Sequence, residues 1–118
     1  MNREEVQNYC ATFTGVELKQ KTYPKLFHSY YLFGKKFAYF EIDDSDQWQF
    51  SIRVAEERFL ELTDQPGIKP SKYLARFHWI TIEQLESVGE EYLEELILWS
   101  YQKAMTSLPK NLQQEISQ

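Results

Sequence analysis

The stretch from residue 27 to residue 54 reads FHSYYLFGKKFAYFEIDDSDQWQFSIRV, and it decides the fold. Its first half holds two aromatic, β-prone runs, residues 27–33 and 36–42, which are separated only by Gly34 and Lys35. This spacing predicts a tight hairpin in which Gly34 supplies the unusual backbone dihedral of the turn. The acidic cluster that follows, Asp43, Asp44, Ser45 and Asp46, is typical of a further turn.

The second half of the stretch has the clearest alternation in the chain. Between residues 47 and 54, apolar and polar side chains alternate: Trp48, Phe50, Ile52 and Val54 on one face, Gln47, Gln49, Ser51 and Arg53 on the other. This pattern predicts a strand with one buried and one wet face, as in an antiparallel meander. Leu18–Tyr23 forms a weaker strand that ends at Pro24, so we expect four consecutive strands.

Helical patterns flank the predicted sheet. Asn2 and Glu5 form a capping box before an apolar stripe that ends near Gly15. After the sheet we expect a helix over Ala55–Thr63 and a last strand over Phe77–Ile82. A long helix over Glu90–Leu108 follows, and the polar tail after Pro109 is a frayed turn or a short helix. The stripe of the long helix is Leu93, Ile97, Tyr101, Ala104 and Leu108.

This order predicts an α+β fold of one domain, residues 1–118. It is a two-layer sandwich, an antiparallel β-meander with helices from both ends packed on one face. The 118 residues suffice for one modest core, and an aromatic share of 16% argues against disorder.

The formal net charge of −5 argues against a sequence-blind polyanion binder but leaves room for a local basic patch. With one cysteine, Cys10, no disulfide can form within the chain. The amino-terminal residues lack the apolar core of a signal peptide, and no run is long enough to span a membrane. We therefore expect a cytoplasmic protein without a membrane partner.

Residues with catalytic or metal-binding chemistry form no recognisable pattern. His28 and His78 stand fifty residues apart, and the spacings of zinc sites, phosphate loops and nucleophile elbows are missing. We expect no enzyme activity, no metal site and no cofactor. The acidic run Glu90–Glu95 is better explained as a solvated helix start, which the helix dipole stabilises, than as a metal- or partner-binding ridge.

The stretch most dense in residues that could face a partner is PGIKPSKYLARFHWITI, residues 66–82. Its charged side chains, with two lysines of the hairpin, form the candidate basic patch: Lys35, Lys36, Lys69, Lys72 and Arg76. Basic groups beside Tyr73 and Trp79 suit phosphate contacts with occasional stacking. In a strand over residues 77–82, His78 and Trp79 face opposite sides, so only one of the two is expected in the core.

Four pieces that span nearly the whole chain carry a family resemblance. They are NREEVQNYCATFTGVE, FGKKFAYFEID, PGIKPSKYLARFHWITI and SYQKAMTSLPKNL. In these pieces the chain resembles the MmcQ/YjbR family of small bacterial proteins. The resemblance implies a frataxin-like (CyaY-like) α+β fold and DNA binding through wing hairpins. On that analogy the contacts fall at 33–37 and 69–79, which adds His78 to the candidate residues. Members commonly carry a basic tract before the His-Trp pair, whereas here Leu74-Ala75-Arg76-Phe77 keeps one charge.

Two functions remain open at this stage. The first is a non-enzymatic DNA-binding domain that contacts double-stranded DNA through the basic loops. The second is a protein-interaction or small-ligand-binding module that uses an exposed aromatic sheet face around Tyr30, Tyr39 and Trp48 or the acidic helix start. A frataxin-like iron role at Glu90–Glu95 is a weaker variant of the second.

Overall fold

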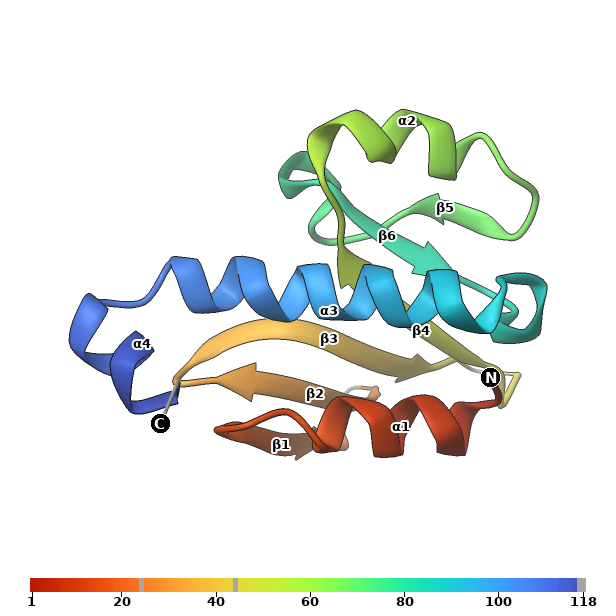
Figure 1. Cartoon of the computed structure of the whole chain (residues 1–118). Coiled ribbons are helices and arrows are strands. Elements are labelled where there is room, and N and C mark those ends of the chain that lie inside the picture. The colour runs from red at the N-terminus through yellow and green to blue at the C-terminus, as the bar shows by residue number, and fades with distance from the viewer. Residues whose placement is uncertain (24, 44, 117–118) are drawn as a thin grey trace.

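A six-stranded antiparallel sheet forms the centre of the protein, with strand order β1-β2-β3-β4-β6-β5 (Figure 1). The structure is a computed structural model, and it describes residues 1–23, 25–43 and 45–116. The strands are β1 (Val16–Lys21), β2 (Leu26–Leu32), β3 (Lys35–Ile42), β4 (Trp48–Arg53), β5 (Ile68–Pro70) and β6 (Trp79–Ile82). The α-helices are α1 (Arg3–Ala11), α2 (Glu56–Thr63), α3 (Glu90–Thr106) and α4 (Lys110–Ile116).

The predicted meander is confirmed, with a small shift in its hairpin. Leu32 pairs with Lys35, so the two-residue loop is Phe33-Gly34 and not Gly34-Lys35. Both loop residues have positive φ, 44° and 80°, as the twist of a type I′ hairpin requires. The expected strand end at Pro24 lies outside the described residues.

The acidic turn between β3 and β4 is held by one carboxylate. Asp43 accepts hydrogen bonds from the Ser45 amide (2.9 Å), the Ser45 hydroxyl (2.7 Å) and the Gln47 amide (3.0 Å). These donors, the backbone of Gln47 first, lower the pKa of Asp43. The side chain therefore acts as a structural part of the turn; Asp44, which was expected in the same turn, is outside the described residues.

Helices α1 and α3 pack on one face of the sheet, as predicted (Figure 1). The whole predicted stripe of the long helix is buried, from Leu93 (0% exposed) to Leu108 (6%). Ser100, within that stripe, donates to the Phe37 carbonyl (2.6 Å) and accepts from the Arg53 amide (3.1 Å). The helix is thus tied to both β3 and β4 by one buried hydroxyl.

Two predictions about residues 66–82 are wrong. Ile68–Pro70 adds a short edge strand, β5, which pairs with β6. Residues Ala75–Phe77 form a 3₁₀ turn, and His78 follows with φ of 66°, so β6 begins only at Trp79. The predicted strand over Phe77–Ile82 is therefore two residues too long, because the left-handed backbone at His78 interrupts the alternation.

The face of the sheet opposite the helices is less exposed to solvent than the alternation predicts. Ser51 and Thr81 point to that face, yet they are 2% and 5% exposed, and their hydroxyls hydrogen-bond at 2.7 Å. Residues 71–78, between β5 and β6, contact this face through the Tyr39–Ser71 hydrogen bond and the Phe27–Tyr73 ring contact, and they cover part of it. In the part of the chain that the structure describes, no helix has the length and apolar character needed to cross a membrane.

Candidate functional site

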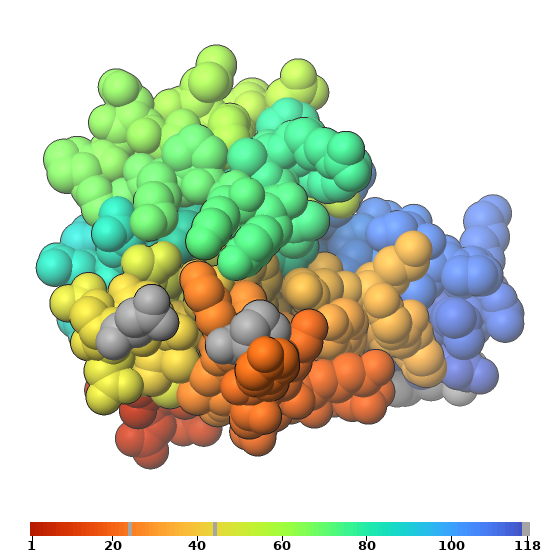
Figure 2. Space-filling view, turned by 180° about the vertical axis from the view of Figure 1, so that it is seen from behind, coloured from red at the N-terminus to blue at the C-terminus, as the bar shows by residue number. Residues whose placement is uncertain are grey.

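Strands β1, β2 and β3 present a row of lysine and aromatic side chains on the face that α1 and α3 leave open. The cross-strand register aligns Lys19 with Ser29 and Tyr39, and Lys21 with Phe27. Tyr31 pairs with Lys36 at the hairpin end of the same face. Figure 2 looks onto this open face from behind the view of Figure 1. Alternation along three neighbouring strands therefore brings charged and aromatic groups together.

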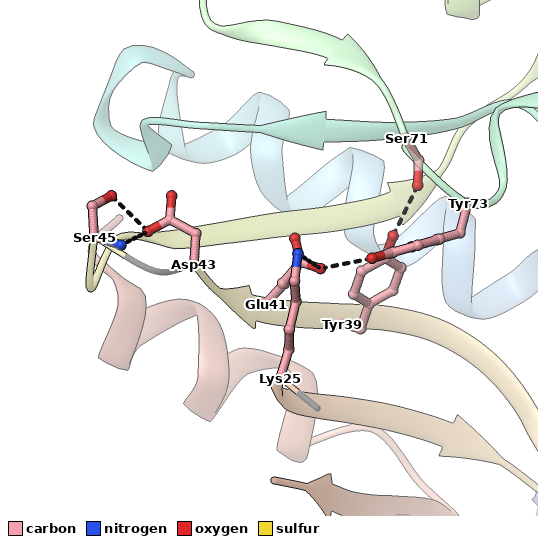
Figure 3. Close-up of polar contacts among 7 residues, drawn as sticks. All are labelled: Lys25, Tyr39, Glu41, Asp43, Ser45, Ser71 and Tyr73. Carbon is pink, nitrogen blue, oxygen red and sulfur yellow. Dashed lines mark hydrogen bonds and ion pairs between the residues drawn. The ribbon is translucent and has the colours of Figure 1, made fainter. Parts of the chain in front are cut away.

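The segment 71–78 forms one wall beside these strands. The Tyr39 hydroxyl and the Ser71 hydroxyl hydrogen-bond at 2.8 Å, and both residues are buried (Figure 3). The Tyr39 ring also packs on Trp79, with centroids 5.7 Å apart, and Phe27 contacts Tyr73 edge to face at 6.3 Å. Buried aromatic and hydroxyl contacts thus fix the segment to the sheet.

Between this wall and the strands lies a groove of about 630 Å³. Three lysines and four aromatic side chains dominate its lining, which is Lys19, Gln20, Lys21, Phe27, Ser29, Tyr31, Lys36, Tyr39, Tyr73 and Leu74. We call this feature the open-face groove. Its size falls within the range of small-molecule sites.

Two ammonium groups share one aromatic ring in the groove. Lys19 Nζ lies 5.0 Å and Lys36 Nζ 5.7 Å from the centroid of Tyr31. Lys36 Nζ also lies 5.1 Å from the centroid of Tyr39. Among the described residues, neither lysine forms an ion pair with a carboxylate. No carboxylate of the described residues therefore neutralises either ammonium group, and both are available to a bound anion.

A short polar chain stands at the other end of the groove (Figure 3). The Tyr73 hydroxyl donates to Glu41 Oε1 at 3.4 Å, and Lys25 Nζ lies 3.9 Å from the same oxygen. Glu41 is thereby partly neutralised, so the groove keeps its positive character along the strands.

Charge is segregated between the sheet and the helices. Residues 16–42 carry five lysines and two glutamates, whereas α2 and α3 together carry seven glutamates against one arginine and one lysine. The formal charges of these two parts are 5 − 2 = +3 and 2 − 7 = −5. The net acidity of the chain therefore resides largely on its helices.

A sequence model of the YjbR family matches residues 11–103 of this chain. The chain belongs to the YjbR family. Its fold is similar to that of the Deinococcus radiodurans protein DR2400, which carries a DUF419 domain, with a TM-score of 0.80 and 21% identity over 97% of this chain and 86% of that one. A Pseudomonas syringae protein is similar with a TM-score of 0.68 and 21% identity, over 88% of this chain and 99% of that one. No curated protein matches the sequence.

The structure of this YjbR chain divides the predicted basic patch. Lys36 and Tyr73 line the open-face groove, and Lys72 Nζ sits 5.5 Å from the Tyr73 ring. Lys35 is exposed at the start of β3, and Lys69 lies on β5, at the sheet edge opposite β1. Strands β4 and β6 lie between β3 and β5, so Lys69 is two strands away from Lys35 and Lys36.

Arg76 and the His-Trp pair lie away from the groove lining. The Arg76 guanidinium covers the Phe77 ring at 4.7 Å, and His78 packs edge to face on Phe59 of α2 at 5.5 Å. Trp79 is 5% exposed and packs on Tyr39, so it cannot stack on a base in this conformation. The stacking role predicted for Trp79 is therefore corrected to a structural one.

The exposed aromatic face expected for an interaction module is also not where it was predicted. Tyr30 and Tyr39 are 2% and 4% exposed, and Tyr30 lies in the core beneath the helices. Burial raises the pKa of Tyr30 to about 12. Trp48 is half-buried between the Arg3 guanidinium (4.3 Å) and His28 (5.1 Å).

The groove residues that sequence reasoning missed are Lys19, Lys21, Phe27 and Tyr31. The lysines alternate in β1, but their face becomes defined only through the pairing of β1 with β2. No group of three or more His, Cys, Asp or Glu side chains in the described ranges is arranged to hold a metal ion.

Proposed function

We propose that this chain is a nucleic-acid-binding protein without catalytic activity, which holds phosphates of DNA on its open sheet face. The observation that carries the proposal is the pair Lys19 and Lys36, two cations on one Tyr31 ring without an ion-pair partner among the described residues. Lys21 and Lys72 extend the same positive surface. Phosphate contacts of this kind fix position on nucleic acid without reading its sequence.

The acidity of the helices lowers the affinity for DNA that we expect. Their formal charge of −5 repels a polyanion at long range, whereas the lysines attract it at contact. A complex with about four neutralised phosphates has a salt slope of roughly −3.6, from about −0.9 per phosphate on duplex DNA. The binding we propose is therefore weak at physiological salt and steeply strengthened at low salt.

Anisotropy of a labelled duplex, titrated at several salt concentrations, tests the proposal. Lys19→Gln with Lys36→Gln should weaken binding and lower the salt slope by about two phosphates, or roughly 1.8. The matched control, Lys103→Gln with Lys110→Gln, changes the same charge on the helical side, at the end of α3 and the start of α4. Equal losses in both double variants would show only an effect of net charge and would refute a site on the open face.

A third double variant distinguishes contact at the groove from contact at the basic loops that the sequence predicted. Lys69→Gln with Arg76→Gln removes cations that lie outside the groove lining. A loss confined to this pair would move the contact surface from the groove to β5 and the 3₁₀ turn. A loss confined to the Lys19 and Lys36 pair supports the groove.

The size of the groove favours a second candidate, a small anionic ligand. A volume of about 630 Å³ lies in the middle of the range for small-molecule sites. Thermal unfolding with inorganic phosphate, citrate and mononucleotides tests it, since a ligand that binds only the folded chain raises Tm with concentration. A Tm that rises for one small anion but not with DNA would favour this candidate over the first.

Two finer proposals concern the fold family and the compartment. A helix before the sheet and a long helix after it, both on one face, support the frataxin-like description; superposition on a frataxin structure tests it. The free thiol of Cys10 supports a cytoplasmic location. Fractionation of cells that express the tagged chain tests the compartment.

A further inference from the structure

We propose that the open-face groove takes unpaired nucleotides, so that the chain binds single-stranded nucleic acid in preference to duplex. This inference rests on the proposed phosphate binding and adds the form of the strand. It is carried by the aromatic rings that line the groove beside the lysines, namely Phe27, Tyr31 and Tyr73.

The face of an aromatic side chain can stack only on a base that is not already stacked between neighbouring bases. In a duplex the flat faces of the bases are covered by their neighbours, and only their edges are presented in the grooves. An unpaired base can lay its face on an aromatic side chain, whatever its identity. Tyr73 is 52% exposed although it contacts Phe27 edge to face at 6.3 Å, so part of its ring surface is open to a base.

The lysines that sit on these rings do not block them. Lys72 lies over Tyr73, and Lys19 and Lys36 over Tyr31. A cation–π contact at an exposed site is weaker than a base stacked on an aromatic ring, so the base displaces the ammonium group. The displaced ammonium stays on the same wall of the groove, where it reaches the phosphate of the same strand.

The groove extends along the strands. Phe27 and Tyr31 are four residues apart on β2, which is about 13 Å of extended chain. Glu41, at the Phe27 end, is held by Tyr73 and Lys25, whereas Lys19 and Lys36 meet at the Tyr31 end. The two lysines therefore direct a phosphate to the Tyr31 end, and the Tyr73 end, where Lys25 is engaged with Glu41, is left to a base.

The wall of the groove makes a duplex a poor fit. Residues 71–78 are anchored by the buried Tyr39–Ser71 hydrogen bond of 2.8 Å, so the groove is concave and pre-formed. A rigid duplex is too wide to enter a space of about 630 Å³, whereas one flexible strand can follow it. A duplex then contacts only the ammonium groups of the groove lysines, Lys19 and Lys36 among them, and not the aromatic rings.

Competition anisotropy between a labelled 20-nucleotide oligo-dT and the same strand annealed to oligo-dA tests the inference at low salt. We expect the single strand to bind at least several-fold more tightly. Tyr73→Leu should weaken single-strand binding about tenfold, because one base–aromatic stack is lost, and should change duplex binding much less, because a duplex presents no free base face to the ring. The matched control is Phe77→Leu, which removes another exposed ring (42%) of the same segment outside the groove lining.

The outcomes separate this inference from the proposal beneath it. Equal or tighter binding of the duplex, or equal effects of Tyr73→Leu and Phe77→Leu on single-strand binding, would overturn the single-strand inference and leave phosphate binding in place. Absence of binding to both forms would overturn the two together. Circular dichroism of each variant establishes that it is folded, which both exposed positions allow.

Discussion

The hydrogen bond between Tyr39 and Ser71 should be the main polar anchor of the segment 71–78. Tyr39→Phe removes one hydroxyl and leaves the other in a site where Ser71 is only 2% exposed. A buried hydroxyl without a partner costs about 1–3 kcal/mol. The same cost applies to Ser71→Ala, which leaves the Tyr39 hydroxyl without its partner. Each single variant should therefore shift the urea midpoint by about 1 M, from a slope of about 1–3 kcal/mol per molar.

The double variant, Tyr39→Phe with Ser71→Ala, decides the argument. Because it removes both polar groups together, its cost should be close to that of one single variant, which gives a coupling of about 1 kcal/mol or more. Urea unfolding measures the free energies, and amide hydrogen exchange should show faster opening of residues 71–78. The Ser51–Thr81 pair, equally buried at 2.7 Å but within the sheet, is the control. Additive costs for Tyr39 and Ser71 would mean that the two hydroxyls do not act on each other.

Three further outcomes test the fold around the groove. Ser100→Ala leaves the Phe37 carbonyl and the Arg53 amide without their buried partner, and urea unfolding should show a loss of about 2–3 kcal/mol. Gly34→Ala forces a side chain into a φ of 80° with no clash around it, so thermal unfolding should show a loss of about 1 kcal/mol from backbone strain alone. Burial raises the pKa of the Cys10 thiol from 9.0 to about 12. The folded chain then keeps a proton that the unfolded chain loses, so stability should fall above about pH 9 by up to about 1.4 kcal/mol per pH unit. Urea unfolding of Cys10→Ala across that range should show a shallower slope.

The sequence could predict those helices and strands that bury one face, because a single buried face produces a regular pattern of apolar residues. Residues 48–54 alternate because β4 has a core side, and the stripe on α3 repeats because one side of that helix is buried. The three-residue strand β5 has no such pattern, and it contains Pro70. Its existence depends on pairing with β6, which is a non-local contact that no local window contains.

The site was predictable only in part, for a related reason. Lys36 and Tyr73 were found because they stand in dense basic and aromatic runs. Lys19 and Tyr31 were missed because the strand register brings them together across the β1–β2 pair. Trp79 was predicted to be accessible, but it is buried. The left-handed backbone at His78 breaks the strand alternation just before it. Residues 71–78 also cover part of a sheet face that the alternation alone predicts to be exposed.

The strand order leaves β1 and β5 as the two edges of the sheet, each with backbone groups open to pairing by another chain. β5 is guarded by its three-residue length and by Pro70, which cannot donate to a ladder. β1 is six residues long and mostly exposed, and its charged residues Glu17, Lys19 and Lys21 oppose the pairing of a second strand with it. The groove lysines Lys19 and Lys21 therefore also protect the protein from edge-to-edge self-association, and glutamine at both positions would leave Glu17 as the one charge on this edge strand.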